Sequence, residues 1–421
     1  MTAIGSAPET KKRKERPRLG RLGALWFFCL GGLGIHFPFF SLYLGENAGL
    51  GGTQVGLVLA TIPLVGLAAQ PLWGQLADRT GARPRLVALL AVGAAAGYAG
   101  LGFARGFSAL LLATALLACF ASALIPSCVA VTLALARDAG PDAFGRARVW
   151  GTVGFLLLVV GFPRLLDSSQ AARGLEALPG GPSEPGLGLM FPITAAWTLC
   201  GALVALALPR EGAVSARALR GEWRALLRHG PFLRVLLVAF LAYFFTQGPM
   251  TMFSLFVRAR GGSLDAVSEM WVLMLLLELP LIFYSGGLLL RVGPRGLLAL
   301  GILACGLRWA VCGASGELGP VYAVSLLHGA VVAGLVVGAP LCADAVVPER
   351  LRTTAQGLLA MVGLGAGGIL SNAAAGWLFE RAGAQFPYLA GGLGALVLGC
   401  LVPVLIPGAR SPRAPGNGVP R

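Results

Sequence analysis

Twelve apolar stretches dominate this chain, and each is long enough to cross the hydrocarbon core of a lipid bilayer, which is roughly 30 Å thick. A water-soluble protein with 56% hydrophobic and 12% charged residues would lack the polar surface needed to cover itself. The sequence therefore predicts an all-α membrane protein with twelve transmembrane helices, divided six and six. The stretches lie near residues 22–44, 53–77, 85–104, 108–136, 148–166, 188–208, 232–257, 266–290, 295–314, 320–346, 353–379 and 386–407.

The basic residues predict the orientation of these spans. If the N-terminus is inside, 26 of the 33 Lys and Arg residues fall in inward segments and six in outward loops, with Arg308 alone in mid-membrane. Short loops rich in Lys and Arg stay in the cytoplasm, so we expect a multi-pass protein of the cell inner (plasma) membrane with both termini cytoplasmic. The net charge of +15 then needs no nucleic-acid partner, and the basic tail is expected to lie on anionic lipid head groups.

The same pattern divides the chain into segments. We expect a basic cytoplasmic tail at 1–21, a six-helix bundle at 22–209, a cytoplasmic linker at 210–231, a second bundle at 232–408 and a cytoplasmic tail at 409–421. The outer segment 167–187 is rich in Gly, Pro and Ser, which predicts a flexible loop. The eight cysteines fall inside apolar stretches, so we interpret them as core residues rather than as disulfides or metal ligands.

Three ionisable residues lie deep in predicted spans of the second half: Glu278, Arg308 and His328. At 1.5 Å per residue, each is about 15–18 Å from a membrane surface, so the three can meet near the midplane. Such groups are costly in lipid unless they are paired or line a wet cavity. We expect Glu278 and His328 to couple transport to protons and Arg308 to bind substrate. The alternative is a Glu278–Arg308 ion pair that only orients helices.

The first half offers its own candidates. Arg148, at the entrance to the fifth span, is positioned to point between the halves, although it could instead reach lipid phosphates. The first span carries Gly34-Ile35-His36-Phe37-Pro38-Phe39-Phe40, and broken helices at the midplane are where transporters place substrate sites. His36 and Phe40 are therefore candidate substrate-binding residues, with His36 as a mere packing residue the alternative.

The loop after the second span carries a repeated motif. Segment 74–83 contains Gly74, Asp78, Arg79, Gly81 and Arg83, and a weaker copy recurs at 286–293 with Leu290 in place of the acid. The spacing resembles the loop between helices two and three of the major facilitator superfamily of transporters. The resemblance implies two pseudo-symmetric six-helix bundles, and it implies a conformational gate at these five residues. We expect Asp344, near the end of the tenth span, to serve as a gate or a loop ion pair.

Further segments resemble the branch of this superfamily that includes lactose permease, the phenylpropionate permeases and the nucleoside–proton symporters. They are Gln70–Gly74, Phe144–Arg148, and Arg308 followed twenty residues later by His328. The resemblance implies a sugar-binding role for the arginine at 148. The acids of lactose permease in its fourth and tenth helices are missing, since Ser127-Cys128-Val129-Ala130 and Val331 stand there. Proton coupling would therefore fall to Glu278 or His328.

These features predict a secondary active transporter, a proton-coupled symporter of a small organic solute such as an aromatic carboxylate, a nucleoside or a sugar. We expect it to work by alternating access, as a monomer and without a cofactor. Efflux of a hydrophobic compound and a non-transporting sensor on the same fold remain alternatives. The chain has no nucleotide-binding loop of the GxxxxGK[ST] type and no catalytic or metal-ligand cluster, so an enzymatic activity is not expected.

Overall fold

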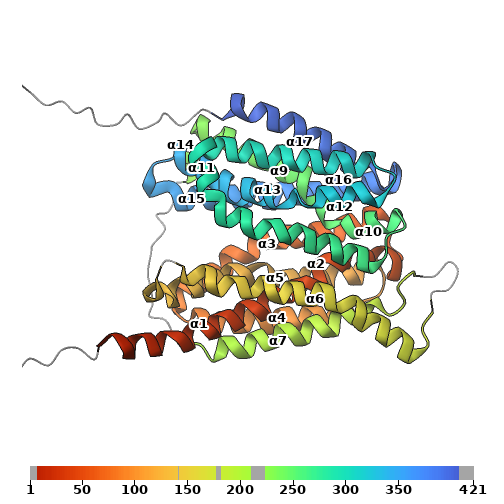
Figure 1. Ribbon diagram of the computed structural model, residues 1–421, viewed down its shortest axis with the longest axis horizontal. Helices are drawn as coiled ribbons and strands as arrows, with labels where there is room; N and C mark the ends of the chain where they lie inside the picture. Colours follow the sequence, from red (N-terminus) through yellow and green to blue (C-terminus); the bar gives the residue numbers. More distant parts are fainter. Residues whose placement is uncertain (1–6, 141, 177–181, 210–222, 407–421) are drawn as a thin grey trace, which may run out of the picture.

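The computed structural model describes residues 7–140, 142–176, 182–209 and 223–406, with side chains described from Leu19 onward except at 138, 223, 279 and 282–288. Throughout these residues the chain is helical and forms two groups, which appear as the lower and upper halves of Figure 1. The first half holds α1 (Ala7–Gly31), α2 (Leu33–Leu42), α3 (Gly52–Thr80), α4 (Arg83–Phe103), α5 (Gly106–Leu135), α6 (Ala143–Arg173) and α7 (Met190–Leu206). The second half holds α9 (Gly230–Thr251), α10 (Phe253–Ala259), α11 (Leu264–Ala314), α12 (Leu318–Ser325), α13 (His328–Val332), α14 (Ala339–Val346), α15 (Arg352–Ala360), α16 (Gly368–Arg381) and α17 (Phe386–Leu405).

Shorter elements complete the description. The single-turn helix α8 (Trp223–Leu226) follows the first half in the sequence and belongs to the predicted linker. Residues 210–222 of this linker lie outside the described residues. Three π-helical turns continue longer helices: η1 (Tyr43–Asn47), η4 (Ala333–Gly338) and η6 (Met361–Gly367). Three 3-10 turns lie in loops: η2 (Arg137–Ala139), η3 (Leu187–Leu189) and η5 (Glu349–Leu351). The predicted tail 409–421 also lies outside the described residues. Helix α1 starts at Ala7, so much of the predicted tail 1–21 is helical.

The twelve predicted spans are accounted for by these helices. Eleven described helices are long and apolar enough to cross a membrane. The remaining expected span, 266–290, corresponds to the first arm of α11, residues 264–292, which is separated from the second arm by a bend at Gly293. An apolar segment in lipid must satisfy its backbone hydrogen bonds internally, which is why each of these runs is a helix.

Each of the two copies of the loop motif contains a glycine with a positive φ where the helix ends or bends. Gly81 closes α3 with φ 61°, and Gly293 bends α11 with φ 69°. Positive φ values of this kind are readily adopted by glycine and disfavoured for residues that carry a Cβ. The motif glycines therefore reverse the chain at matching points of the two halves.

The two halves meet most closely at one end of the molecule. The start of α1 and the end of α17 lie at the same end, on the left in Figure 1, which we call the terminal end; the opposite end is the far end. Near the far end, α3 crosses α16 backbone to backbone, because a Cβ on Gly56 would lie 2.4 Å from the Asn372 carbonyl oxygen. The backbone N–H of Thr53 also donates to Glu380 Oε2 of α16, at 2.7 Å.

A charged cluster joins the halves at the same end. Arg258 of α10 contacts Glu184 Oε1 at 2.7 Å and Glu46 Oε1 at 3.6 Å, and all three side chains are largely shielded from solvent. We call these three residues the far-end latch. Glu184 belongs to segment 167–187, to which the sequence assigned only flexibility. At least the part of that segment around Glu184 is tied to the second half.

The terminal end of α3 is more exposed than its far end. The stretch of α3 nearest this end is exposed at 70–72, 74–76 and 78–80, whereas its far-end stretch is mostly buried at 55–61. Hydrogen bonds from Thr53, Ser254, Arg258 and Ser268 to the other half lie at the far end or near the middle. This conformation is therefore closed at the far end and separated at the terminal end.

The glycine crossing yields a test. We expect Gly56→Ala to lower the thermal unfolding midpoint, because the added methyl has no room beside Asn372 and overpacking of this kind costs about 1–3 kcal/mol. The matched control is Gly100→Ala in α4, where a Cβ would meet nothing within 4 Å. A melt of both purified variants should show a loss only for Gly56→Ala. Equal midpoints would contradict the close crossing.

Candidate functional site

The first arm of α11 presents a row of side chains toward the middle of the molecule. Trp271, Met274 and Glu278 are spaced by three and four residues, so they lie along one face of the helix. The second arm of the same helix carries Arg308, and α13 begins with His328. The three predicted ionisable residues therefore come from two arms of one bent helix and from the start of another.

Arg308 is almost fully buried, with 1% of its surface exposed. Its Nη1 donates to Nδ1 of His328 at 3.0 Å, and Nη2 lies 3.2 Å from the Met274 sulfur. The guanidinium also lies over the rings of Trp309 and Phe253, at 4.1 and 5.5 Å from the ring centroids. Among the described residues no carboxylate contacts it directly, so its nearest acceptors are neutral. Its positive charge must be balanced from further away.

His328 connects Arg308 to Glu278. A guanidinium can only donate, so Nδ1 of the imidazole must be the acceptor and the ring proton of the neutral form lies on Nε2. Nε2 is 3.8 Å from Glu278 Oε2, which is longer than a hydrogen bond but within ion-pair range. The N–H of the imidazole thus faces the carboxylate. Arg308, His328 and Glu278 form a chain that runs from a permanent cation through a neutral ring to an acid, and we call it the polar chain.

A break in the tenth span positions this chain. Helix α12 ends at Ser325 and α13 starts at His328, with Leu326 and Leu327 in a turn between them. The next residue, Gly329, packs directly on α11, because a Cβ there would lie 2.8 Å from the backbone nitrogen of Glu278. A larger residue would push α13 away. The glycine therefore lets the imidazole approach the carboxylate.

Arg148 adds a charge from the first half. It lies on α6 with its guanidinium 5.1 Å from the centroid of the Trp26 ring and its Nη1 3.5 Å from Thr152 Oγ1. Its charge and that of Glu278 act on one another across the boundary between the halves. Arg148 is therefore within electrostatic range of the polar chain, and its role in substrate binding stays a prediction. Glu278 pairs with His328 rather than directly with Arg308.

Two other candidates lie elsewhere. His36 and Phe40 are buried inside the first half, where the His36 ring packs on Phe40 at 4.4 Å and on Tyr98 of α4 at 5.0 Å. They occupy the face of α2 that is turned toward α4 and α7. Phe37, the next residue after His36, points the other way and contacts Trp271 at 5.4 Å. His36 and Phe40 therefore lie apart from the polar chain; Nδ1 of His36 has no hydrogen-bond partner among the described residues, and a role of the two residues in substrate binding stays a prediction.

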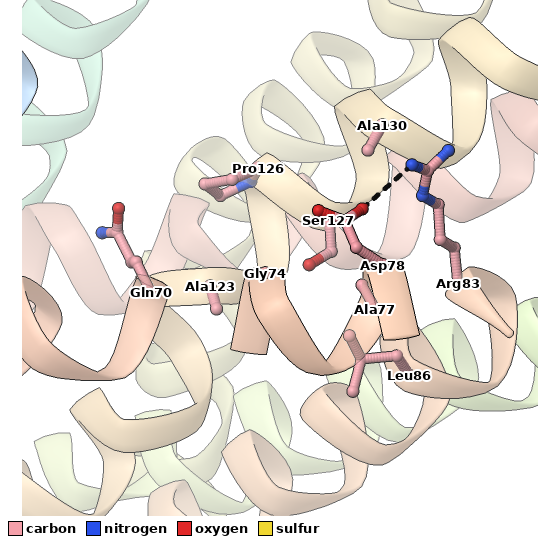
Figure 2. A pocket seen from close by; sticks show the side chains of 10 residues that line it. All are labelled: Gln70, Gly74, Ala77, Asp78, Arg83, Leu86, Ala123, Pro126, Ser127 and Ala130. Atoms are coloured by element: carbon pink, nitrogen blue, oxygen red, sulfur yellow. Dashed lines mark hydrogen bonds and ion pairs between the residues drawn. The ribbon is translucent and has the colours of Figure 1, made fainter. Parts of the chain in front are cut away.

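The predicted gate residues contact partners within their own halves. Asp78 pairs with Arg83 at 3.1 Å beside a cavity of about 150 Å³, and Gly74 lines the same cavity (Figure 2). Arg79 is exposed. In the second half, Asp344 Oδ1 accepts from Gln356 Nε2 at 2.8 Å. The ion pair of Asp78 and the hydrogen bond of Asp344 thus each lie within one half, and the role of these residues as a gate stays a prediction.

Sequence reasoning missed the uncharged members of the site. Trp271, Met274 and Met250 all contact the polar chain or Phe37, yet none is ionisable. The usable signal was helical spacing, since Met274 and Trp271 lie four and seven residues before Glu278. Aromatic and Met residues at such spacing also occur throughout ordinary membrane helices, so the pattern alone did not single them out.

Comparison with known proteins supports the architecture. The maltose permease of Geobacillus stearothermophilus is 30% identical over 360 residues, covering 85% of this chain and 86% of that protein. The uncharacterized transporter YwbF of Bacillus subtilis (strain 168) is 24% identical over 380 residues, covering 90% and 91%. The crystal structure of the D323A mutant of the nucleoside transporter NupG matches with a TM-score of 0.80, covering 92% of this chain and 100% of that one. Its identity of 17% establishes a common fold only.

The family model extends over most of the chain. The model described as the MFS_1 like family matches residues 19–390, which include both halves and the whole polar chain. The helices, the two related halves and the matched region agree with one another. The protein belongs to the MFS_1 like family of the major facilitator superfamily and is a multi-pass membrane transporter rather than an enzyme.

Proposed function

We propose that this transporter is a proton-coupled symporter of a small hydroxyl-rich solute, with α-glucosides such as maltose as the first class to test. One observation carries the proposal. Glu278, whose side chain is 15% exposed, faces a neutral imidazole of its own half and the charge of an arginine from the other half. An acid so placed can change its charge without losing a fixed ion-pair partner.

Glu278 is the proton-carrying group in this proposal. Its nearest ionisable neighbour is His328, at 3.8 Å, and His328 is kept in one tautomer by Arg308. With Nδ1 engaged, the ring presents its Nε2 proton to the ionised carboxylate. Protonation of Glu278 removes the negative charge that this N–H faces, so the ring and the acid are coupled. The proton gradient across the membrane supplies the energy, and the protein carries the proton together with the solute.

The charge of Glu278 also affects the contact between the halves. Arg148 belongs to α6 and Glu278 to α11, so their attraction acts across the boundary between the halves. Coulomb attraction is stronger in a low-dielectric interior than in water, and it disappears when the acid is protonated. Proton binding therefore weakens one interaction between the halves. In this way, binding of a proton affects the relative movement of the two halves that alternating access requires.

The solute class follows from the donors in the site. Arg308 Nε has no acceptor among the described residues, Arg148 Nη1 is 3.5 Å from the Thr152 hydroxyl, and the site contains aromatic rings from both halves. Hydroxyl groups of a sugar accept such hydrogen bonds, and the C–H face of a sugar ring packs on aromatic rings. The relative named as a maltose permease supports this class. An aromatic carboxylate is the second candidate, favoured by the excess of two arginines over one acid.

The orientation completes the proposal. With 26 of the 33 Lys and Arg residues in the segments that would face inward, the terminal end faces the cytoplasm. The conformation described here is then open to the inside and closed to the outside. Uptake and efflux remain distinguishable by the direction of accumulation.

Uptake by purified protein in proteoliposomes tests the function. We expect accumulation of labelled maltose when the outside is acidic, and loss of accumulation when a protonophore collapses the gradient. A nucleoside and hydrocinnamate serve as the competing solutes. Accumulation of none of the three, or maltose accumulation that ignores the protonophore, would overturn the proposal. Accumulation driven only by an acidic interior would indicate efflux.

The role of Glu278 gives a specific prediction. Glu278→Gln keeps the shape of the side chain but removes its charge change, so gradient-driven accumulation should fall by at least tenfold. Exchange of labelled for unlabelled maltose should persist, since it needs no net proton movement. The control is Glu317→Gln, which changes an exposed acid at the start of α12. A mutant that still concentrates maltose with a pH profile like the parent would remove Glu278 from the coupling.

Paired substitutions of His328 test the tautomer. Asn carries its polar group near the position of Nδ1, so His328→Asn should keep an acceptor for Arg308 while losing the N–H that faces Glu278. Gln reaches toward the position of Nε2, so His328→Gln should leave the Arg308 donor unpaired. We expect His328→Gln to lower the melting midpoint more, because an unpaired buried charge costs several kcal/mol. Both should impair coupled uptake. The reverse order of melting midpoints would contradict the assignment of Nδ1 as acceptor.

A further inference from the structure

Trp271 has an unsatisfied buried donor beside the polar chain. Only 4% of its surface is exposed, and its indole Nε1–H has no acceptor among the described residues. Leaving a buried donor unpaired is unfavourable, and such groups are uncommon in native proteins, so each one calls for a physical explanation. In a transporter that partner can be a solute that binds in one stage of the cycle.

The position of Trp271 puts it next to the site and in contact with both halves. Its ring centroid lies 5.4 Å from that of Phe37 on α2 and 5.5 Å from that of Phe155 on α6, both in the first half. It lies 6.4 Å from the His328 ring in the second half. A solute held between the halves near His328 would therefore be within reach of this ring.

Trp271 also lies on the closed side of the polar chain. Helix α11 begins at the far end with Leu264, so Trp271, seven residues before Glu278, is about 10 Å closer to that end. The hydroxyl of Ser268, one turn nearer the far end, donates to the Val159 carbonyl of α6 at 2.8 Å. Trp271 with Phe37 and Phe155 thus forms a wall between the polar chain and the closed end. We call these three residues the aromatic wall.

A second unsatisfied donor lies close by. The Nε–H of Arg308 also has no acceptor among the described residues, although the guanidinium is buried and bonded to His328 through Nη1. Two orphan N–H groups, from Trp271 and Arg308, therefore neighbour the same imidazole. A saturated ring bearing several oxygens suits such a place, since it offers acceptors to the donors and C–H groups to an aromatic surface.

We infer that Trp271 is a substrate-binding residue that donates its indole N–H to an oxygen of the transported solute and forms, with its ring, the far-end wall of the binding site. The inference rests on the proposed function, because it requires a solute with ring or hydroxyl oxygens. It adds a specificity-determining residue that carries no charge and takes no part in proton transfer. The pH dependence of uptake should therefore not depend on it.

The test compares Trp271→Phe with its parent in proteoliposomes, using maltose as the probe. Phenylalanine keeps an aromatic ring but removes the N–H, so the half-saturating maltose concentration should rise about five- to tenfold, as expected for one lost hydrogen bond. The maximal rate and the pH profile should stay near the parental values. Trp377→Phe is the matched control, because Trp377 on α16 is 53% exposed and lies outside the site.

Monodeoxy maltoses identify the oxygen. The parent should bind one analogue more weakly than maltose, while Trp271→Phe should bind that analogue and maltose equally, because the contact is already lost. If the variant has the parental half-saturation for maltose and discriminates among all analogues as the parent does, the inference is wrong, and Trp271 only packs. If the parent accumulates none of maltose, the nucleoside and hydrocinnamate, the proposed function is overturned and this inference falls with it.

Discussion

The guanidinium of Arg308 sets the strongest constraint on this structure, because it cannot lose its proton and is held with 1% exposure inside a membrane protein. An isolated cation in such surroundings is very costly. The structure offsets this cost with a bond to the His328 imidazole, two thioether sulfurs and two aromatic faces. The bond from Arg308 fixes the tautomer of the neutral imidazole, so that its Nε2–H faces Glu278. The arrangement requires the bend and the break in the surrounding helices.

The surrounding helices fix the positions of the residues of the polar chain, whereas the charge of Glu278 can change. Gly329 brings α13 against the backbone of Glu278, and the bent α11 supplies both Glu278 and Arg308. Only Glu278 combines a changeable charge with a long-range partner in the other half, Arg148. At the far end, the latch around Arg258 and the glycine crossing at Gly56 keep the halves together. The two halves are thus held together by packing and ion pairs at the far end, whereas their interaction in the middle depends on the charge of Glu278.

The fold and the charged part of the site could be predicted from the sequence because hydrocarbon imposes simple rules. Runs of apolar residues have to be helices, and Glu278, Arg308 and His328 stood out because charged groups are rare at that depth. The direction in which a side chain points was harder to predict. His36 and Phe37 are adjacent, yet a turn of about 100° per residue sends one into the first half and the other toward Trp271.

Other features depended on contacts that no single segment contains. Glu184 lies in a segment whose composition predicts flexibility, and the approach of Arg258 from the second half gives its carboxylate a cationic partner. Trp271 is one of eight tryptophans, and nothing in its neighbours along the chain distinguishes it from a packing residue. Its unsatisfied N–H became visible only when the surrounding helices were in place.

The central claim is that the charge on Glu278 controls how the two halves are arranged. It is tested most directly by pulsed electron paramagnetic resonance with spin labels at Gln75→Cys on α3 and Thr353→Cys on α15, both exposed at the terminal end, in a background without reactive cysteines. The account predicts that the proportion of protein separated at this end changes between pH 8 and pH 5, and that the change disappears in Glu278→Gln. A pH response of the same size in both proteins would contradict it.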